Sequence, residues 1–107
     1  MANVIYNSFK AKIMDGSVDL DTDTIKVALV TSSYTPDQDA HDFFDDVTNE
    51  VAGTGYSAGG ASLANKSVTQ DNTDNEGVFD ADDVTWSSST ITARGAVVYN
   101  AETHSGC

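Results

Sequence analysis

A glycine-rich stretch, Gly53–Gly60, contains one group of residues whose types and spacing could support catalysis. Within it, Gly55, Ser57 and Gly59 match G-x-S-x-G, which in serine hydrolases places a nucleophilic serine on a sharp turn between a strand and a helix. Such a turn needs a large parallel sheet, whereas this chain has 107 residues and no alternating strand and helix patterns. We therefore predict a tightly turned loop in which Ser57 is structural, and a small serine hydrolase is the alternative.

Carboxylates are the second group of candidates, because 17 of the 107 residues are Asp or Glu. Asp19, Asp21 and Asp23 alternate as calcium ligands do, but the glycine and the distal glutamate of an EF-hand loop are missing. The cluster Asp80–Asp83 would supply the acid and base of a glycosidase only in a cleft that fixes the separation of two carboxyl groups. We interpret both clusters as turn caps, since the short Asp side chain readily bonds nearby backbone N–H groups.

Histidine and cysteine offer little further chemistry. His41 and His104 are the only histidines, and two histidines alone make a weak zinc signal. Cys107 is the only cysteine, so an internal disulfide is impossible, which fits synthesis in a reducing cytosol. The sequence therefore predicts a protein without catalytic residues, bound metal or cofactor.

The charge balance restricts the possible partners. The formal net charge is −12, from five basic residues against 17 acidic ones. Binding to nucleic acid depends on Lys and Arg side chains that neutralise phosphates, so we expect no nucleic-acid partner. The chain has no run of about 20 apolar residues and no secretory signal pattern, so we expect no membrane partner either. The acidity fits an exposed surface or a contact with a basic partner.

An N-terminal helix is predicted from Val4 to about Met14. Asn3 can cap its start, and Gly16 suits the left-handed position that ends a helix. One face carries an apolar stripe that recurs every four residues, and we expect this stripe to pack on the protein's own sheet. The stripe consists of Ile5, Phe9 and Ile13.

Strand patterns follow the helix. Thr24–Thr31 is apolar on both faces, which predicts a central strand, and a further strand is expected at Leu63–Gln70. Val78–Asn100 reads as two or three strands around the only tryptophan, Trp86, and ends in the apolar run Ala96–Tyr99. The predicted fold is therefore mainly β. We expect the whole chain to form a single small antiparallel β-sandwich or barrel-like domain with a short N-terminal helix.

The segment between the first two strands, Ser32–Ala61, is the least regular part of the chain. We expect one helical turn at His41–Asp46, which buries Phe43 or Phe44, and a short edge strand at Asn49–Val51. A loop this long in a small domain is usually functional or ordered by a partner.

Two features predict contact with other chains. The apolar strand Ala96–Tyr99 has no strand after it to cover its edge, and such an edge invites pairing with another chain. The long loop carries aromatic side chains of the kind that anchor interfaces, and the only arginine can pair with a carboxylate across an interface. We therefore expect a homo-oligomer, of which a trimer is one form. The predicted interface residues are Tyr34, Phe43, Phe44, Tyr56, Arg94 and Tyr99.

Several stretches together resemble the small structural proteins of tailed bacteriophages. The resemblance covers about residues 3–99 and is carried by Gly-Tyr-Ser-Ala-Gly-Gly at 55–60, Asp-Asp-Val-Thr-Trp at 82–86 and Ala-Arg-Gly-Ala at 93–96. It implies a virion component, made in the host cytoplasm, that binds the major capsid protein or another virion protein. The implied role is capsid decoration, as a cement protein that stabilises the head shell. A tail-fibre or receptor-binding module is the alternative.

The end of the chain departs from this pattern. Similar proteins continue into at least one more apolar strand, where this chain has Ala-Glu-Thr-His-Ser-Gly-Cys. Either the chain lacks a C-terminal strand, or a partner supplies that strand.

We expect Ser57→Ala to leave folding and particle binding unchanged, because the motif has no fold to support a nucleophile. Covalent labelling with a serine-directed phosphonate, followed by mass spectrometry, checks this expectation. Labelling of the wild type that disappears in Ser57→Ala would contradict it and favour the hydrolase.

Overall fold

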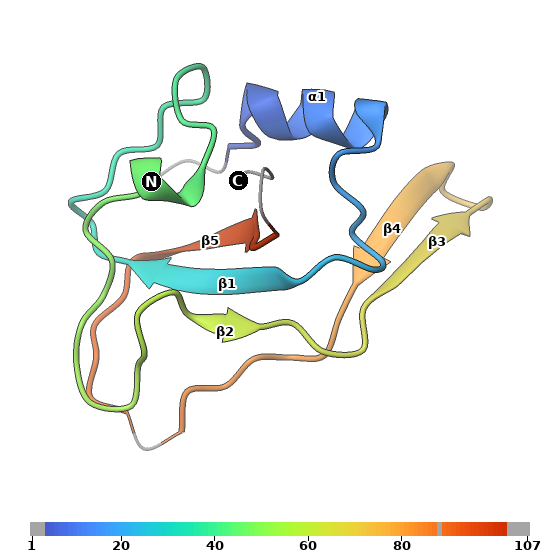
Figure 1. Cartoon of the computed structure of the whole chain (residues 1–107). Coiled ribbons are helices and arrows are strands. Elements are labelled where there is room, and N and C mark those ends of the chain that lie inside the picture. Colours follow the sequence, from blue (N-terminus) through green and yellow to red (C-terminus); the bar gives the residue numbers. More distant parts are fainter. Residues whose placement is uncertain (1–3, 88, 103–107) are drawn as a thin grey trace.

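The computed structural model describes residues 4–87 and 89–102, and it shows two antiparallel sheets and one short helix (Figure 1). This arrangement confirms the predicted mainly β class with an N-terminal helix. The elements, in chain order, are α1 (Asn7–Asp15), β1 (Ile25–Val30), the 3-10 helix η1 (Phe44–Asp46), β2 (Ala61–Ser62), β3 (Ser67–Asp71), β4 (Glu76–Asp80) and β5 (Gly95–Asn100).

β1 is the central strand of a three-stranded sheet with the order β2-β1-β5. It pairs antiparallel with β5 from Ile25 opposite Asn100 to Val30 opposite Gly95, and it pairs antiparallel with β2 on its other side. Residues from both faces of β1 are buried, namely Ile25 on one face and Ala28 and Val30 on the other. The predicted central strand is therefore confirmed.

The second sheet is the hairpin β3–β4. Of the strand predicted at Leu63–Gln70, only the last four residues, 67–70, lie in a strand, β3. The predicted strand is interrupted because Asn65 adopts a left-handed conformation with a φ of 52°, so the chain turns between β2 and β3. Asn75, with a φ of 59°, makes the same kind of break in the loop between β3 and β4. Asparagine tolerates this conformation better than most residues, which explains its use at both turns.

The strand predicted around Trp86 is wrong. Residues 81–86 form no strand, and the described residues between β4 and β5 contribute only an isolated bridge from Thr90 to Thr54. Trp86 packs instead against the side chain of Tyr56, with ring centroids 5.8 Å apart. The apolar ring is therefore covered by another side chain without a strand ladder. Only the two ends of the predicted segment, in β4 and β5, form strands.

Helix α1 begins at Asn7 and not at Val4, with Tyr6 as the residue before it. The predicted cap, Asn3, lies outside the described residues. Gly16 ends the helix in the left-handed conformation, with a φ of 84°, as predicted. The existence of the helix and its C-terminal signal are confirmed, and its start is corrected.

The apolar stripe at the N-terminus is only partly covered, so the expectation that it packs on the sheet is corrected. Phe9 is half-buried against the core, but Ile5 is 58% and Ile13 is 42% exposed. No residue of α1, a helix that is described along its whole length, is fully buried. Tyr6, just before the helix, is buried instead and takes the place in the core that the stripe was expected to fill.

The core is a small cluster rich in tyrosine. Alternation along β1 and β5 puts four of its members on one face of the sheet, and the helix and the long loop cover that face. The buried members are Tyr6, Ala28, Val30, Tyr34, Val97 and Tyr99, with Phe9, Phe44 and Val47 packed against them. The helical turn expected at 41–46 is confirmed as η1, and Phe44 is the residue that packs inward.

Gly60 holds the chain close to β1, and this contact leads to a test of the fold. A Cβ atom at position 60 would collide with the Val27 carbonyl oxygen and lie 2.8 Å from the Ala28 Cα atom, and Gly60 has a φ of 81°. We expect Gly60→Ala to lower the free energy of unfolding by about 3–5 kcal/mol, because left-handed strain adds to overpacking. Urea denaturation measures this loss.

Gly16→Ala is the matched control. Gly16 has nearly the same φ, 84°, but a Cβ atom there would meet nothing within 4 Å. The control should therefore cost only about 1–2 kcal/mol, from left-handed strain alone. Equal losses in the two variants would show that the close approach of Gly60 to β1 contributes nothing to stability.

Candidate docking surfaces

Two of the six predicted interface residues, Tyr34 and Tyr99, lie in the protein's own core, with exposed fractions of 2% and 6%. The Tyr99 hydroxyl donates to the Gly59 carbonyl (2.6 Å), and its ring stacks on Phe44, with centroids 4.0 Å apart. Phe44, a third predicted residue, therefore packs inward too. The predicted interface role is corrected for these three residues, because their contacts lie inside the chain.

The Tyr34 hydroxyl links the N-terminal segment to the long loop. It lies 2.7 Å from the Tyr6 hydroxyl and 2.9 Å from Nδ1 of His41. The Asp37 N–H also donates to this nitrogen (3.2 Å), so Nδ1 acts as an acceptor and the Tyr34 hydroxyl acts as its donor. His41 also stacks on Tyr34, with ring centroids 5.7 Å apart. The imidazole therefore has a structural role, because it holds Tyr34 in place.

Phe43 and Arg94 are the predicted interface residues that lie at the surface. Phe43 is 38% exposed, and the Lys12 Nζ atom lies 4.0 Å from its ring centroid, a cation–π contact that joins the long loop to α1. The Arg94 side chain is exposed, while its backbone N–H donates to the Val30 carbonyl (2.9 Å). No carboxylate of the described residues forms an ion pair with the Arg94 guanidinium.

Tyr56, the sixth predicted residue, is half-buried and fastens the glycine-rich loop to the sheet. Its hydroxyl donates to the Glu50 carboxylate and accepts the Leu29 N–H (3.0 Å). The same Glu50 oxygen accepts the Gly59 N–H at 2.7 Å. Burial, together with the hydrogen bond to Glu50, raises the pKa of Tyr56 to about 12. The loop is therefore held by a polar cluster centred on Glu50.

Ser57 lies in a turn that lacks the geometry of a hydrolase elbow. Its carbonyl accepts the Gly60 N–H (3.0 Å), and its side chain is exposed. The next element is the short strand β2, where an elbow would begin a helix. The downstream histidine, His104, lies outside the described residues. The structure at Ser57 thus matches the predicted tightly turned loop.

The aspartates at 19–23 cap a turn before β1, as predicted. Asp19 Oδ1 accepts the N–H groups of Asp21 (3.0 Å) and Thr22 (3.2 Å), and Asp23 Oδ2 accepts the Asp19 N–H (3.0 Å). Hydrogen bonds from the Thr22 side chain and from the two N–H groups hold the pKa of Asp19 below its usual range. These carboxylates are therefore used by their own backbone.

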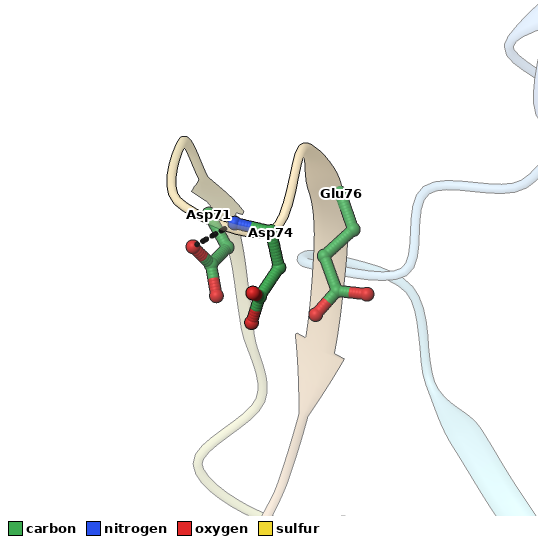
Figure 2. A group of neighbouring side chains, drawn as sticks. All are labelled: Asp71, Asp74 and Glu76. Atoms are coloured by element: carbon green, nitrogen blue, oxygen red, sulfur yellow. Dashed lines mark hydrogen bonds between the residues drawn. The ribbon is translucent and has the colours of Figure 1, made fainter.

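One group of carboxylates in the described chain could supply oxygen ligands to a cation. Asp71, Asp74 and Glu76, around the β3–β4 turn, bring one carboxylate oxygen each within 4.8 Å of the others (Figure 2). Asp71, however, already accepts the N–H groups of Asp74 (3.1 Å) and Thr73 (2.9 Å), and these bonds lower its pKa. Asp74 and Glu76 are exposed to water. We interpret the group as the cap of a hairpin turn.

Apolar side chains near the N-terminus, two of them exposed and one half-buried, form the first candidate docking surface, which we call the helix stripe. It consists of Ile5, Phe9 and Ile13, the residues that the sequence singled out for burial. Met14, next to Ile13 on α1, is 82% exposed. Exposed apolar area of this kind gains free energy when a partner covers it, so the stripe is available for docking.

The second surface, which we call the edge groove, is a hollow of about 460 Å³ beside β5. Residues 4–6 and Phe9 line it together with Arg94, residues 95–98 of β5 and the apolar side chain of Phe79. Val98 is 49% exposed there. Sequence reasoning missed Val98, because an unbroken apolar run does not show which residues face out. The alternation of burial along β5, with Val97 buried and Val98 exposed, is visible only in the structure.

Comparisons with protein-family models, with curated proteins and with solved structures find no match to this chain. Its described residues include no helix that is both long and apolar enough to cross a bilayer. The two exposed apolar surfaces are therefore the features from which a function can be inferred.

We expect Tyr56→Phe to lower the free energy of unfolding by about 1–3 kcal/mol at neutral pH. The Glu50 carboxylate and the Leu29 N–H each lose a hydrogen-bond partner, while the ring still packs against Trp86. Urea denaturation of both proteins measures the difference. Equal stability would contradict a role for this hydroxyl in fastening the loop.

The contribution of Tyr56 also has a pH dependence of known sign. Its pKa is raised in the folded state, so folding holds the phenol proton more tightly than the unfolded chain, where tyrosine titrates near pH 10. The stabilisation is therefore complete below about pH 10 and is lost as the pH rises toward about 12. The stability difference between wild type and Tyr56→Phe should shrink across this window. A difference that stays constant would contradict the assigned cause.

Proposed function

We propose that this chain is a non-enzymatic structural protein of a tailed-bacteriophage virion, which decorates the head shell and stabilises it as a cement protein. The observation that carries the proposal is the helix stripe, an exposed apolar surface beside a helix that has no buried residue of its own. The resemblance to phage structural proteins indicates the kind of assembly. The partner is the major capsid protein or another virion protein.

The helix stripe suits a docking mode in which a helix lies in an apolar groove of its partner. Phe9 and Ile13 lie four residues apart and so on one side of α1, and Ile5 extends the apolar surface before the helix begins. Complete burial of a side chain of this size stabilises a contact by about 1.5–3 kcal/mol. Because these residues are only partly covered in the isolated chain, much of that gain is left for binding.

The acidity of the chain supports docking on a larger assembly. A net charge of −12 makes copies repel one another in solution, which keeps them soluble. The same charge draws the chain to basic patches on a shell and orients it there. Binding that depends in part on such attraction weakens as salt screens it.

We assign docking to the helix stripe and not to the aromatic side chains of the long loop. Tyr34 and Phe44 pack in or against the core, and Tyr56 fastens the loop to the sheet. Removing the loop would therefore take away part of the core, so its loss could not separate binding from folding. Single substitutions in the stripe can make that separation.

The test compares the wild type with Ile13→Lys for binding to purified particles that lack the protein. A lysine at this exposed position should leave the melting temperature unchanged and reduce particle binding roughly tenfold or more, because a buried apolar contact is replaced by a charge. Quantitative mass spectrometry of particles from infected cells measures the number of copies per virion. Hundreds of copies are the expected result for a decoration protein.

Val68→Lys is the matched control. Val68 is 53% exposed, but it lies in the β3–β4 hairpin, away from the helix stripe in sequence. This variant should bind particles as the wild type does. Equal losses in the two variants would show that added positive charge, and not the stripe, controls binding. A handful of copies located at the tail would overturn decoration in favour of a tail component.

A further inference from the structure

Part of the backbone of β5 has no strand partner among the residues that the structure describes. In the order β2-β1-β5, only one side of this strand is paired. The Ala101 N–H donates to the Thr24 carbonyl (2.8 Å), so in this antiparallel ladder Val97 also directs its N–H and C=O groups at β1. Ala96 and Val98 therefore direct theirs to the open side. No strand among residues 4–87 and 89–102 pairs with that side.

The open stretch of β5 is short and apolar. Ala96 is exposed and Val98 is half-exposed, whereas Asn100, near the end of the strand, is buried and donates through Nδ2 to Asp23 (2.8 Å). The edge groove continues this surface, and Ile5, which lines the groove, is 58% exposed. An added strand would therefore satisfy backbone groups and cover apolar surface at the same time.

The charges at the two ends of β5 indicate which strand fits there. Arg94, just before the strand, is exposed and has no ion pair within the described part of the chain. At the other end lies Glu102, whose Oε1 accepts the Thr24 N–H (2.9 Å), so its second carboxylate oxygen is the one available to a further partner. In an antiparallel pair, the start of one strand lies beside the end of the other. Two copies of β5 thus bring each arginine near Glu102 of the other copy, whereas a parallel pair would place the arginines together.

We propose that two copies of this chain pair through β5, in antiparallel orientation, to form a dimer with two-fold symmetry. In the proposed register, Val97 lies opposite Val97 of the second copy. Ala96 of each copy then lies opposite Val98 of the other. Every outward N–H and C=O group of Ala96 and Val98 gains a partner in this way. Arg94 lies opposite Asn100 of the second copy, and Glu102 of that copy is a diagonal neighbour within reach of a long side chain.

The dimer goes beyond the proposed function, because it is a property of the isolated chain. Its sheet continues through the two-fold axis in the order β2-β1-β5-β5-β1-β2, so the open edge of β5 is covered in each copy. The net charge of −12 on each copy opposes association at low ionic strength. At about 0.15 M salt, repulsion beyond about 8 Å is screened, and the close contacts of Arg94 and the apolar edge dominate.

Sedimentation velocity of the full chain at about 0.15 M salt, over a concentration series up to about 1 mM, tests the proposal. The wild type should sediment as a dimer at the upper concentrations. Val98→Pro should raise the dissociation constant roughly tenfold or more, because proline removes an outward N–H but no bond to β1. Thermal unfolding followed by circular dichroism shows whether this variant is folded.

A pair of charge reversals keeps the test decisive if Val98→Pro does not fold. Arg94→Glu and Glu102→Lys should each be monomeric alone, because each homodimer would place like charges together at both ends of the interface. Glu102→Lys also loses the acceptor of the Thr24 N–H, so circular dichroism of each variant checks that it is folded. An equal mixture of the two should dimerise, since each interface site then holds opposite charges again. Only reciprocal antiparallel pairing of β5 predicts this rescue.

Three results would overturn the dimer: a wild type that stays monomeric, charge variants that dimerise as the wild type does, or a mixture that stays monomeric. A trimer of the wild type would overturn the two-fold symmetry. None of these results bears on particle binding, which the Ile13→Lys comparison measures separately. Failure of the dimer and failure of the decoration role are therefore distinguishable.

Discussion

The pairing of β1 with β5 is the contact on which the rest of the structure depends. It joins segments from distant parts of the chain, since Ile25 lies opposite Asn100 and Val30 lies opposite Gly95. Pairing these distant segments closes a long stretch of chain, which costs entropy, and the ladder and the core next to it must offset that cost. The core has few members, so hydrogen bonds that fasten the loops to the sheet are needed as well.

Tyrosine meets both needs at once, because its ring adds apolar area and its hydroxyl reaches a polar group. The hydroxyls of two tyrosines bond to each other, that of a third bonds to the Glu50 carboxylate, and that of the fourth bonds to the Gly59 carbonyl. The irregular segment 32–61 is thereby ordered from within the chain. This explains why its aromatic side chains, which look like interface anchors in the sequence, are used by the fold. The four tyrosines are Tyr6, Tyr34, Tyr56 and Tyr99.

The surfaces that the core leaves uncovered are the basis of both proposals. Ile5 belongs to the helix stripe and also lines the edge groove, so the two surfaces adjoin. A dimer formed through β5 would present two helix stripes to one shell. Once the first stripe is bound, the second faces a high effective concentration of its site, which strengthens attachment without any new contact. If both proposals hold, this linkage would strengthen the attachment of a small acidic chain to a large assembly.

The sequence by itself determined the elements that rest on local signals. Apolar residues on both faces predicted the central strand β1, and Gly16 predicted the end of α1. Only the tertiary structure decided which side chains are buried. The alternating residues around Trp86 resemble a strand, but a strand also needs a neighbouring strand, and periodicity does not report one. Likewise, the loop that holds Tyr34 shows no hydrophobic periodicity in the sequence. Whether the Tyr34 side chain points inward is therefore decided by long-range contacts, here with Tyr6.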